Sequence, residues 1–150
     1  MSLNEEVELL RNISMFARIE PSKLKLLAFT SERLTFQGGQ DLCVQGGDGD
    51  SAFIIIEGDA DVIVDTPKGP LTVAAMSKND VVGEIAILCD VPRTATVRAT
   101  SNLTALKISK DLFFRLVTEF PQMAVEIMRV LAARLNTTTA QLMQARQQGG

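Results

Sequence analysis

The chain of 150 residues contains no histidine, and this absence excludes several kinds of site. A Ser-His-Asp triad, a histidine-ligated metal centre and a histidine general base all need an imidazole. No paired carboxylates or activated nucleophile stand at a useful spacing either. We therefore expect no enzymatic activity, no metal site and no cofactor.

Tryptophan and tyrosine are also absent, so no indole or phenol ring can close over a ligand. Acidic residues outnumber basic ones by 18 to 15, which argues against a nucleic-acid surface because such a surface needs a basic excess. No apolar run approaches the roughly 18 residues that a membrane span requires. Residues 1–6 lack the features of a signal peptide, and Cys43 and Cys89 form no CxxC motif. We expect a cytoplasmic protein with reduced cysteines and no membrane contact.

Hydrophobic residues make up 46% of the chain and charged residues 22%, which is ordinary for a globular protein. We expect a single domain over residues 1–150, with helices in residues 1–30. A helix is predicted over residues 4–16 from apolar residues at helical spacing, which are Val7, Leu10, Ile13 and Phe16. A second helix is predicted to begin at Pro21 and to continue to Phe29.

Residues 31–108 change to short, β-branched and often alternating segments, which clusters of Gly, Asp, Asn and Pro separate. The predicted strands are 33–36, 42–44, 52–56, 60–64, 71–75, 95–99 and 103–108. Short strands at a spacing of about ten residues predict an antiparallel sandwich or barrel. The expected fold class is therefore α+β, and mainly β.

Residues 109–146 are predicted to form two further helices. Ser109 caps the first helix, and Pro121 begins the second, which continues to about Ala145 without glycine or interior proline. The apolar positions of the last helix follow the heptad steps of a coiled-coil seam, with Thr138 in register; they are Ala124, Met128, Leu131, Leu135 and Leu142. Two interpretations remain open: this stripe is the seam of a homodimer, or it covers the β domain of its own chain.

The segment over residues 83–97 carries most of the chemistry. Gly83 permits a close backbone turn, and residues 84–88 can form one helical turn whose free N–H groups attract an anion. If the loop folds back, the guanidinium of Arg93 faces these amides, and together they make a phosphate site. Glu84 can accept hydrogen bonds from hydroxyls nearby, and a phosphate with a neighbouring diol describes a nucleotide ribose. The alternative is a turn glycine beside a surface ion pair of Glu84 and Arg93, worth at most about 1 kcal/mol.

This segment resembles the phosphate-binding cassette of the cyclic nucleotide-binding domain family, which includes the catabolite activator protein and the regulatory subunits of cyclic-AMP-dependent kinase. The matching residues are Gly83, Glu84, Ile85, Ala86, Ile87, Pro92, Arg93, Thr94, Ala95, Thr96 and Val97. The resemblance implies a double-stranded antiparallel β-helix, a jelly-roll-like sandwich, flanked by an N-terminal helical bundle and a long C-terminal helix.

The resemblance also implies which residues bind the ligand: Gly83, Glu84, Ile85, Ala86, Arg93, Thr94 and Ala95. In the family pattern, Arg93 pairs with the exocyclic phosphate oxygens, and Glu84 accepts a hydrogen bond from the ribose 2′-hydroxyl. Gly83, Ala86 and Ala95 match positions that offer backbone contacts to the ribose or the phosphate.

Two features of the sequence bear on which base the ligand carries, and they favour different cyclic nucleotides. A threonine at the position of Thr94 is associated with cyclic GMP in the family. Thr138 and Thr139 resemble a pair on the dimer helix of the catabolite activator that meets the adenine amino group, although a merely polar patch is the alternative. We favour cyclic AMP, because this feature agrees with the heptad pattern. The expected aliphatic lid over the base comes from Met128, Leu131 and Leu135.

The expected function is therefore a cyclic nucleotide sensor in which ligand binding moves the C-terminal helix. Its expected partner is a second copy of the chain or a downstream effector protein, and not nucleic acid. Two alternatives remain. The chain is the effector part of a Crp-like transcription regulator without its DNA-binding unit, since few residues follow the last helix. Otherwise it is a degenerate module that keeps the fold for dimerisation and binds nothing.

Overall fold

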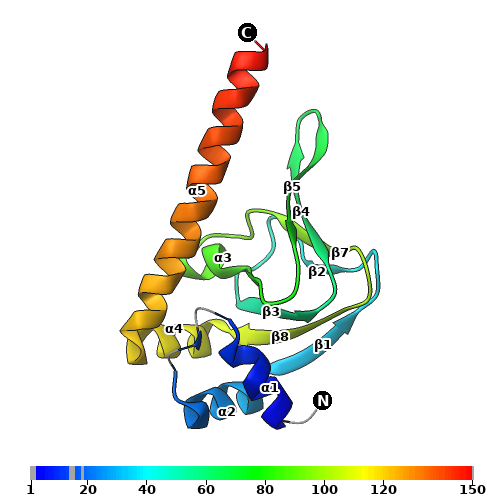
Figure 1. The fold of residues 1–150 in the computed structure, drawn as a ribbon. Coiled ribbons are helices and arrows are strands. Elements are labelled where there is room, and N and C mark those ends of the chain that lie inside the picture. The colour runs from blue at the N-terminus through cyan, green and yellow to red at the C-terminus, as the bar shows by residue number, and fades with distance from the viewer. Residues whose placement is uncertain (1–2, 14–15, 18, 150) are drawn as a thin grey trace.

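A computed structural model describes the backbone of residues 3–13, 16–17 and 19–149 (Figure 1). Within these ranges, the side chains outside the description are those of Leu3, Ile85, Val130, Arg134, residues 137–142 and residues 145–149.

Two four-stranded antiparallel sheets form the body of the fold, with the orders β1-β8-β3-β6 and β2-β7-β4-β5. The strands are β1 (Glu32–Phe36), β2 (Asp41–Cys43), β3 (Ser51–Glu57), β4 (Ala60–Thr66), β5 (Gly69–Met76), β6 (Val81–Val82), β7 (Thr96–Ala99) and β8 (Leu103–Ser109). Most neighbours within a sheet are distant in the sequence, as in a jelly roll. The predicted antiparallel sandwich is confirmed, and every predicted strand overlaps an observed one.

Strand β3 separates two hydrophobic cores. It lies between β8 and β6, and its side chains are buried from Ser51 to Ile56, because both faces of the sheet are covered at this strand. Phe53 and Ile55 face the core between the two sheets, whereas Ile54 packs into a second core under the helices. Strand β6 was not predicted, since its two residues are too few to show a period.

The N-terminal helices cover one face of the β1-β8-β3-β6 sheet. They are α1 (Leu3–Arg11) and α2 (Pro21–Thr30). The prediction of a helix to residue 16 was wrong, because α1 ends at Arg11. Tight turns follow, in which the amide of Ile13 donates to the carbonyl of Leu10 at 3.1 Å and the amide of Phe16 donates to the carbonyl of Ile13 at 2.9 Å. Ile13 and Phe16 are therefore buried in the helical core without belonging to the helix.

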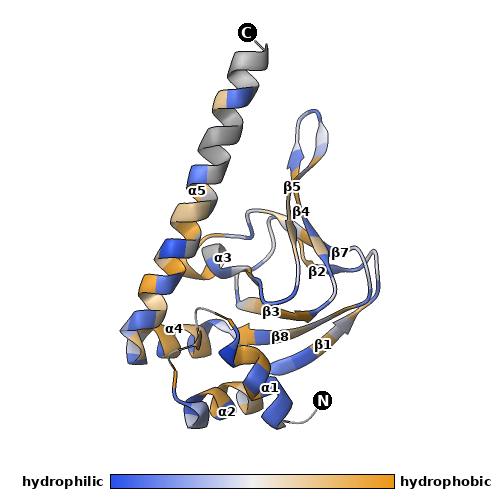
Figure 2. Cartoon of the chain, viewed as in Figure 1, coloured by the Kyte–Doolittle hydropathy of each residue, from blue (hydrophilic) through white to orange (hydrophobic). Residues whose placement is uncertain are grey.

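The C-terminal helices are α4 (Lys110–Glu119) and α5 (Pro121–Gly149). The hydroxyl of Ser109 caps α4 as predicted, accepting a hydrogen bond from the amide of Leu112 at 3.2 Å. Figure 1 shows α5 running past α3 (Glu84–Cys89) and projecting beyond the sandwich, in the same direction as the β4–β5 hairpin. The apolar residues of its first turns, orange in Figure 2, meet α4 and the helical core, where Met123 and Ile127 are buried.

Candidate functional site

The predicted anion site begins where β6 turns into α3. Gly83 is the N-cap of α3 and has the left-handed backbone angle φ 87°. A Cβ atom at this position would lie 2.5 Å from Nη1 of Arg93 and 3.2 Å from the carbonyl oxygen of Ser51. Only glycine therefore permits this turn and the close approach of the arginine. The turn leaves the first amides of α3 without partners within the helix, which is the feature that the sequence predicted.

Arg93 lies inside the protein and is only 5% exposed. Its Nε donates to the carbonyl of Asp48 at 3.1 Å, its Nη1 to the carbonyl of Gly83 at 3.2 Å and its Nη2 to the hydroxyl of Ser51 at 3.2 Å. The carboxylate of Asp50 lies 3.6 Å from Nη2, and the guanidinium carbon lies 6.0 Å from the centre of the Phe53 ring. These contacts hold the guanidinium in one position, so its charge has a defined place.

The loop over residues 44–50 supports the backbone on both sides of this arginine. The amide of Gly46 donates to the carbonyl of Arg93 at 2.8 Å, and the amide of Arg93 donates to the carbonyl of Gly47 at 2.8 Å. A Cβ atom on Gly49 would lie 2.5 Å from the Cβ atom of Ala86, so this loop packs directly against α3. The loop therefore ties the arginine to the helix that begins at Gly83.

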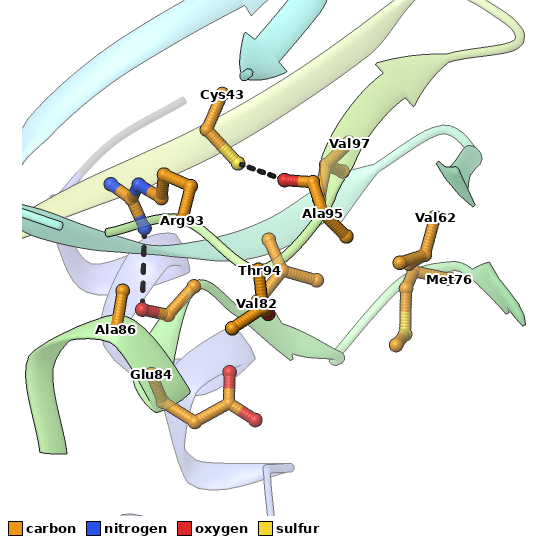
Figure 3. A pocket seen from close by; sticks show the side chains of 11 residues that line it. Cys43, Val62, Met76, Val82, Glu84, Ala86, Arg93, Thr94, Ala95 and Val97 are labelled. Atoms are coloured by element: carbon orange, nitrogen blue, oxygen red, sulfur yellow. Dashed lines mark hydrogen bonds between the residues drawn. The ribbon is translucent and has the colours of Figure 1, made fainter. Parts of the chain in front are cut away.

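A cavity of about 440 Å³, including the part open to solvent, lies between α3 and the strands of the second sheet (Figure 3). Among the residues that line it are six that the sequence predicted, which are Gly83, Glu84, Ala86, Arg93, Thr94 and Ala95. The structure therefore brings the predicted residues together around one space.

Glu84 is the first residue of α3 and is 3% exposed, although it lines the cavity. Figure 3 shows its carboxylate and the guanidinium of Arg93 pointing in different directions. Two different groups of one ligand can therefore meet them. The alternative of a surface ion pair does not describe two residues that are both buried.

Five further residues line the cavity, and they were not predicted as site residues: Cys43, Val62, Met76, Val82 and Val97. They come from five different strands, β2, β4, β5, β6 and β7, and provide an apolar wall. The sequence signals for them are weak, because each is an ordinary strand residue. The contacts of Arg93 with Asp48 and Ser51 were also missed, although the glycine-rich run before Ser51 marks a loop that can approach another backbone.

Burial raises the pKa of the Cys43 thiol above its ordinary value, and the nearby charge of Arg93 offsets part of this effect. The Sγ atom lies 3.9 Å from the carbonyl oxygen of Ala95 (Figure 3). The neutral thiol is therefore the favoured form, and it behaves as part of the apolar wall.

The predicted base contacts on α5 do not line the cavity in this structure, as far as their side chains are described. Met128 is 60% exposed and Leu135 is 66% exposed, whereas Leu131 packs against the helical core. The side chains of Thr138 and Thr139, like that of Ile85, lie outside the described residues. These contacts stay predictions.

Within the described part of the chain, no group of three or more His, Cys, Asp or Glu residues could hold a metal ion. No described helix is long and apolar enough to cross a membrane.

The fold and the cavity together define a β-sandwich domain with a cavity at the start of a short helix. Residues 33–120, more than half of the chain, match the profile of the cyclic nucleotide-binding domain, and the chain belongs to this family.

Two relatives show how the family is used. A CRP-like cAMP-activated global transcriptional regulator of Mycobacterium tuberculosis is 28% identical over 138 residues, which cover 90% of this chain and 61% of the relative. A cAMP-dependent protein kinase regulatory subunit of Dictyostelium discoideum is 33% identical over 123 residues, which cover 79% of this chain and 36% of the relative. The chain thus spans less than two thirds of either relative. Both are regulatory proteins by name.

One solved structure shows the same fold. The regulatory domain of Toxoplasma gondii PKA, crystallised with cAMP, superimposes with a TM-score of 0.77 over 87% of this chain and 50% of that chain. The sequences are 20% identical, so this likeness supports the fold alone.

Proposed function

We propose that the chain binds a cyclic nucleotide in the cavity beside α3 and acts as a regulatory sensor rather than as an enzyme. The observation that carries this proposal is the buried guanidinium of Arg93 at the cavity wall. Three of its five N–H donors have protein acceptors, which leaves one N–H on each terminal nitrogen without a hydrogen-bond acceptor among the described residues. Two charged donors on one guanidinium can pair with two oxygens of a phosphate.

The first amides of α3 complete the phosphate site in this proposal, and Ala86 is placed to contribute one of them. Glu84 binds the ribose 2′-hydroxyl, and the backbone of Gly83, Ile85 and Ala95 lies along the sugar and the phosphate. The apolar wall of Val62 and the other strand residues receives the less polar part of the ligand. The roles of Gly83, Glu84, Ala86 and Ala95 are supported by their position in the lining of one cavity, and that of Ile85 by the resemblance alone.

We propose cyclic AMP as the ligand in preference to cyclic GMP. Both curated relatives are named for cAMP, and the heptad pattern of α5 favours a dimer helix that presents Thr138 and Thr139 to a base. Thr94 lines the cavity and has a hydroxyl that suits either base, so it does not decide the choice.

The partner that we propose is a second copy of the chain, in contact through α5. Met128 and Leu135 are one heptad apart, and both are largely exposed. A movement of α5 toward the cavity would bring Met128, Leu131 and Leu135 over the base, which is the differential contact that a ligand needs to shift a conformational equilibrium. We expect Leu135→Glu to give a monomer in analytical ultracentrifugation, whereas a monomeric wild-type protein would contradict the dimer.

We also propose that residues 1–150 act as one cytoplasmic domain. When the cyclic nucleotide binds, this domain would pass the change to a regulatory part, either in the same protein or in a separate one. The similarity to the CRP-like transcriptional regulator of Mycobacterium tuberculosis supports this proposal.

Calorimetric titration with cyclic AMP, cyclic GMP and linear 5′-AMP tests the proposal, with the melting temperature as a second readout. A ligand at 100 times its Kd stabilises the folded state by about 2.7 kcal/mol. We expect stabilisation by the cyclic nucleotides only, and tighter binding of cyclic AMP. Binding of none of them would identify the chain as a degenerate module, and tighter binding of cyclic GMP would overturn the choice of base.

A further inference from the structure

The hydroxyl of Ser51 lies at the centre of the contacts around Arg93. Ser51 is the first residue of β3, and it is 1% exposed. Its Oγ accepts a hydrogen bond from Nη2 of Arg93 at 3.2 Å and donates one to Oδ1 of Asp50 at 3.1 Å. The three side chains therefore form a short chain of hydrogen bonds that ends on a carboxylate.

Among the described residues, the hydroxyl is the only neutral side-chain group that accepts a hydrogen bond from the guanidinium. The other acceptors are the backbone carbonyls of Asp48 and Gly83, which the loop and the turn fix in place. Asp50 lies 3.6 Å from Nη2, beyond hydrogen-bond distance, and its side chain is 69% exposed. Water therefore competes for this carboxylate, and it holds the guanidinium less firmly than a buried hydroxyl does.

The direction of Nη2 decides where its second N–H points. The guanidinium is planar, so a hydrogen bond from one N–H of Nη2 fixes the direction of the other. With Ser51 as the acceptor of one N–H, the second N–H of Nη2 and the second N–H of Nη1 are the two donors that have no acceptor among the described residues. Without the hydroxyl, Nη2 is drawn to the carboxylate of Asp50 instead.

We propose that Ser51 is a positioning residue for the phosphate-binding arginine. Its buried hydroxyl fixes one N–H of Nη2 and presents the other to the ligand. This inference rests on the proposed function for its effect on affinity. Its effect on the guanidinium does not depend on that function, because the hydrogen bond is present without a ligand.

The first test compares the affinities of wild type, Ser51→Ala and Ser51→Thr for cyclic AMP. We expect a loss of roughly fivefold to tenfold in Ser51→Ala, the size expected for one hydrogen bond, and recovery in Ser51→Thr, which keeps the hydroxyl. Ser101→Ala is the matched control, because the exposed Ser101 also loses one hydroxyl contact, from the amide of Asp59 at 3.1 Å, but it lies outside the cavity lining. In an Arg93→Lys background, Ser51→Ala should cause no further loss. An equal loss in both backgrounds, or no loss in either, would overturn the proposal.

The second test uses NMR on protein with ¹⁵N-labelled arginine and no ligand. A held guanidinium gives separate Nη signals, because rotation about its Nε–Cζ bond is slow. We expect separate signals for Arg93 in wild type and in Ser51→Thr, and a shifted Nη2 signal in Ser51→Ala, because the carboxylate of Asp50 replaces the hydroxyl as the partner of Nη2. Unchanged signals in Ser51→Ala would refute positioning, even if the affinity falls. If wild type binds no cyclic nucleotide but the signals change as expected, the proposed function fails and the positioning role stands.

Discussion

Arg93→Lys separates the charge of the arginine from its shape. Lysine keeps the positive charge, but a single ammonium replaces a planar group that makes hydrogen bonds to Asp48, Gly83 and Ser51 and leaves one N–H on each terminal nitrogen for a ligand. The lysine lacks the planar pair of donors, so we expect it to keep at most one of these two contacts with a phosphate. Loss of one charge-assisted hydrogen bond amounts to about 1.5–3 kcal/mol, which corresponds to a roughly 10-fold to 150-fold weaker Kd.

Isothermal titration calorimetry with cyclic AMP measures this change, and thermal unfolding reports the cost to the fold. Arg98→Lys is the control: Arg98 is an arginine on β7, 47% exposed, whose Nε donates to Asp41 at 2.8 Å, away from the cavity. We expect an unchanged Kd in Arg98→Lys. An affinity of Arg93→Lys within twofold of wild type would refute the assignment of the phosphate to this guanidinium.

Three further changes test the site. Glu84→Gln removes the buried carboxylate charge and should weaken cyclic AMP roughly tenfold while leaving 2′-deoxy cyclic AMP nearly unchanged in competition assays; an equal loss for both ligands would contradict the ribose contact. Gly83→Ala should lower both the melting temperature and the affinity more than Gly39→Ala does. Both glycines have positive φ, but of the two added Cβ atoms only the one at position 83 would meet another group, Nη1 of Arg93 at 2.5 Å. Equal effects of the two substitutions on affinity would contradict the close approach. Burial raises the pKa of Cys43 and so lowers its thiolate fraction, and iodoacetamide at pH 8 should therefore modify Cys43 more slowly than the exposed Cys89. The modification of Cys43 should become faster as the pH rises and slower when cyclic AMP is present. Mass spectrometry that finds no protection of Cys43 by the nucleotide would place the ligand elsewhere.

The elements that the sequence predicted well are those whose signals are local. Pro21 and Pro121 begin helices because proline suits the first helical turn, and Ser109 caps α4. The run over residues 52–56 predicted a strand because it is β-branched, and its burial on both faces explains why it does not alternate. Helix α1 was predicted too long because Ile13 and Phe16 keep an apolar spacing that tight turns also satisfy.

The cassette was predicted from the sequence because its residues are close together in the chain, from Gly83 to Ala95. The opposite wall of the cavity was not, since Cys43, Val62 and Met76 come from three strands of one sheet that meet only when this sheet forms. No periodicity or motif marks a residue whose role depends on pairing across the fold. The hydroxyl of Ser51 was missed for the same reason, as its partner is 42 residues away in the sequence.

A crystal structure of the protein grown with cyclic AMP addresses the central assignment most directly. We expect density for the nucleotide in the cavity beside α3, with phosphate oxygens within hydrogen-bond distance of both terminal nitrogens of Arg93 and the ribose 2′-hydroxyl on the carboxylate of Glu84. A nucleotide bound at another place, or one whose phosphate points away from Arg93, would contradict the account.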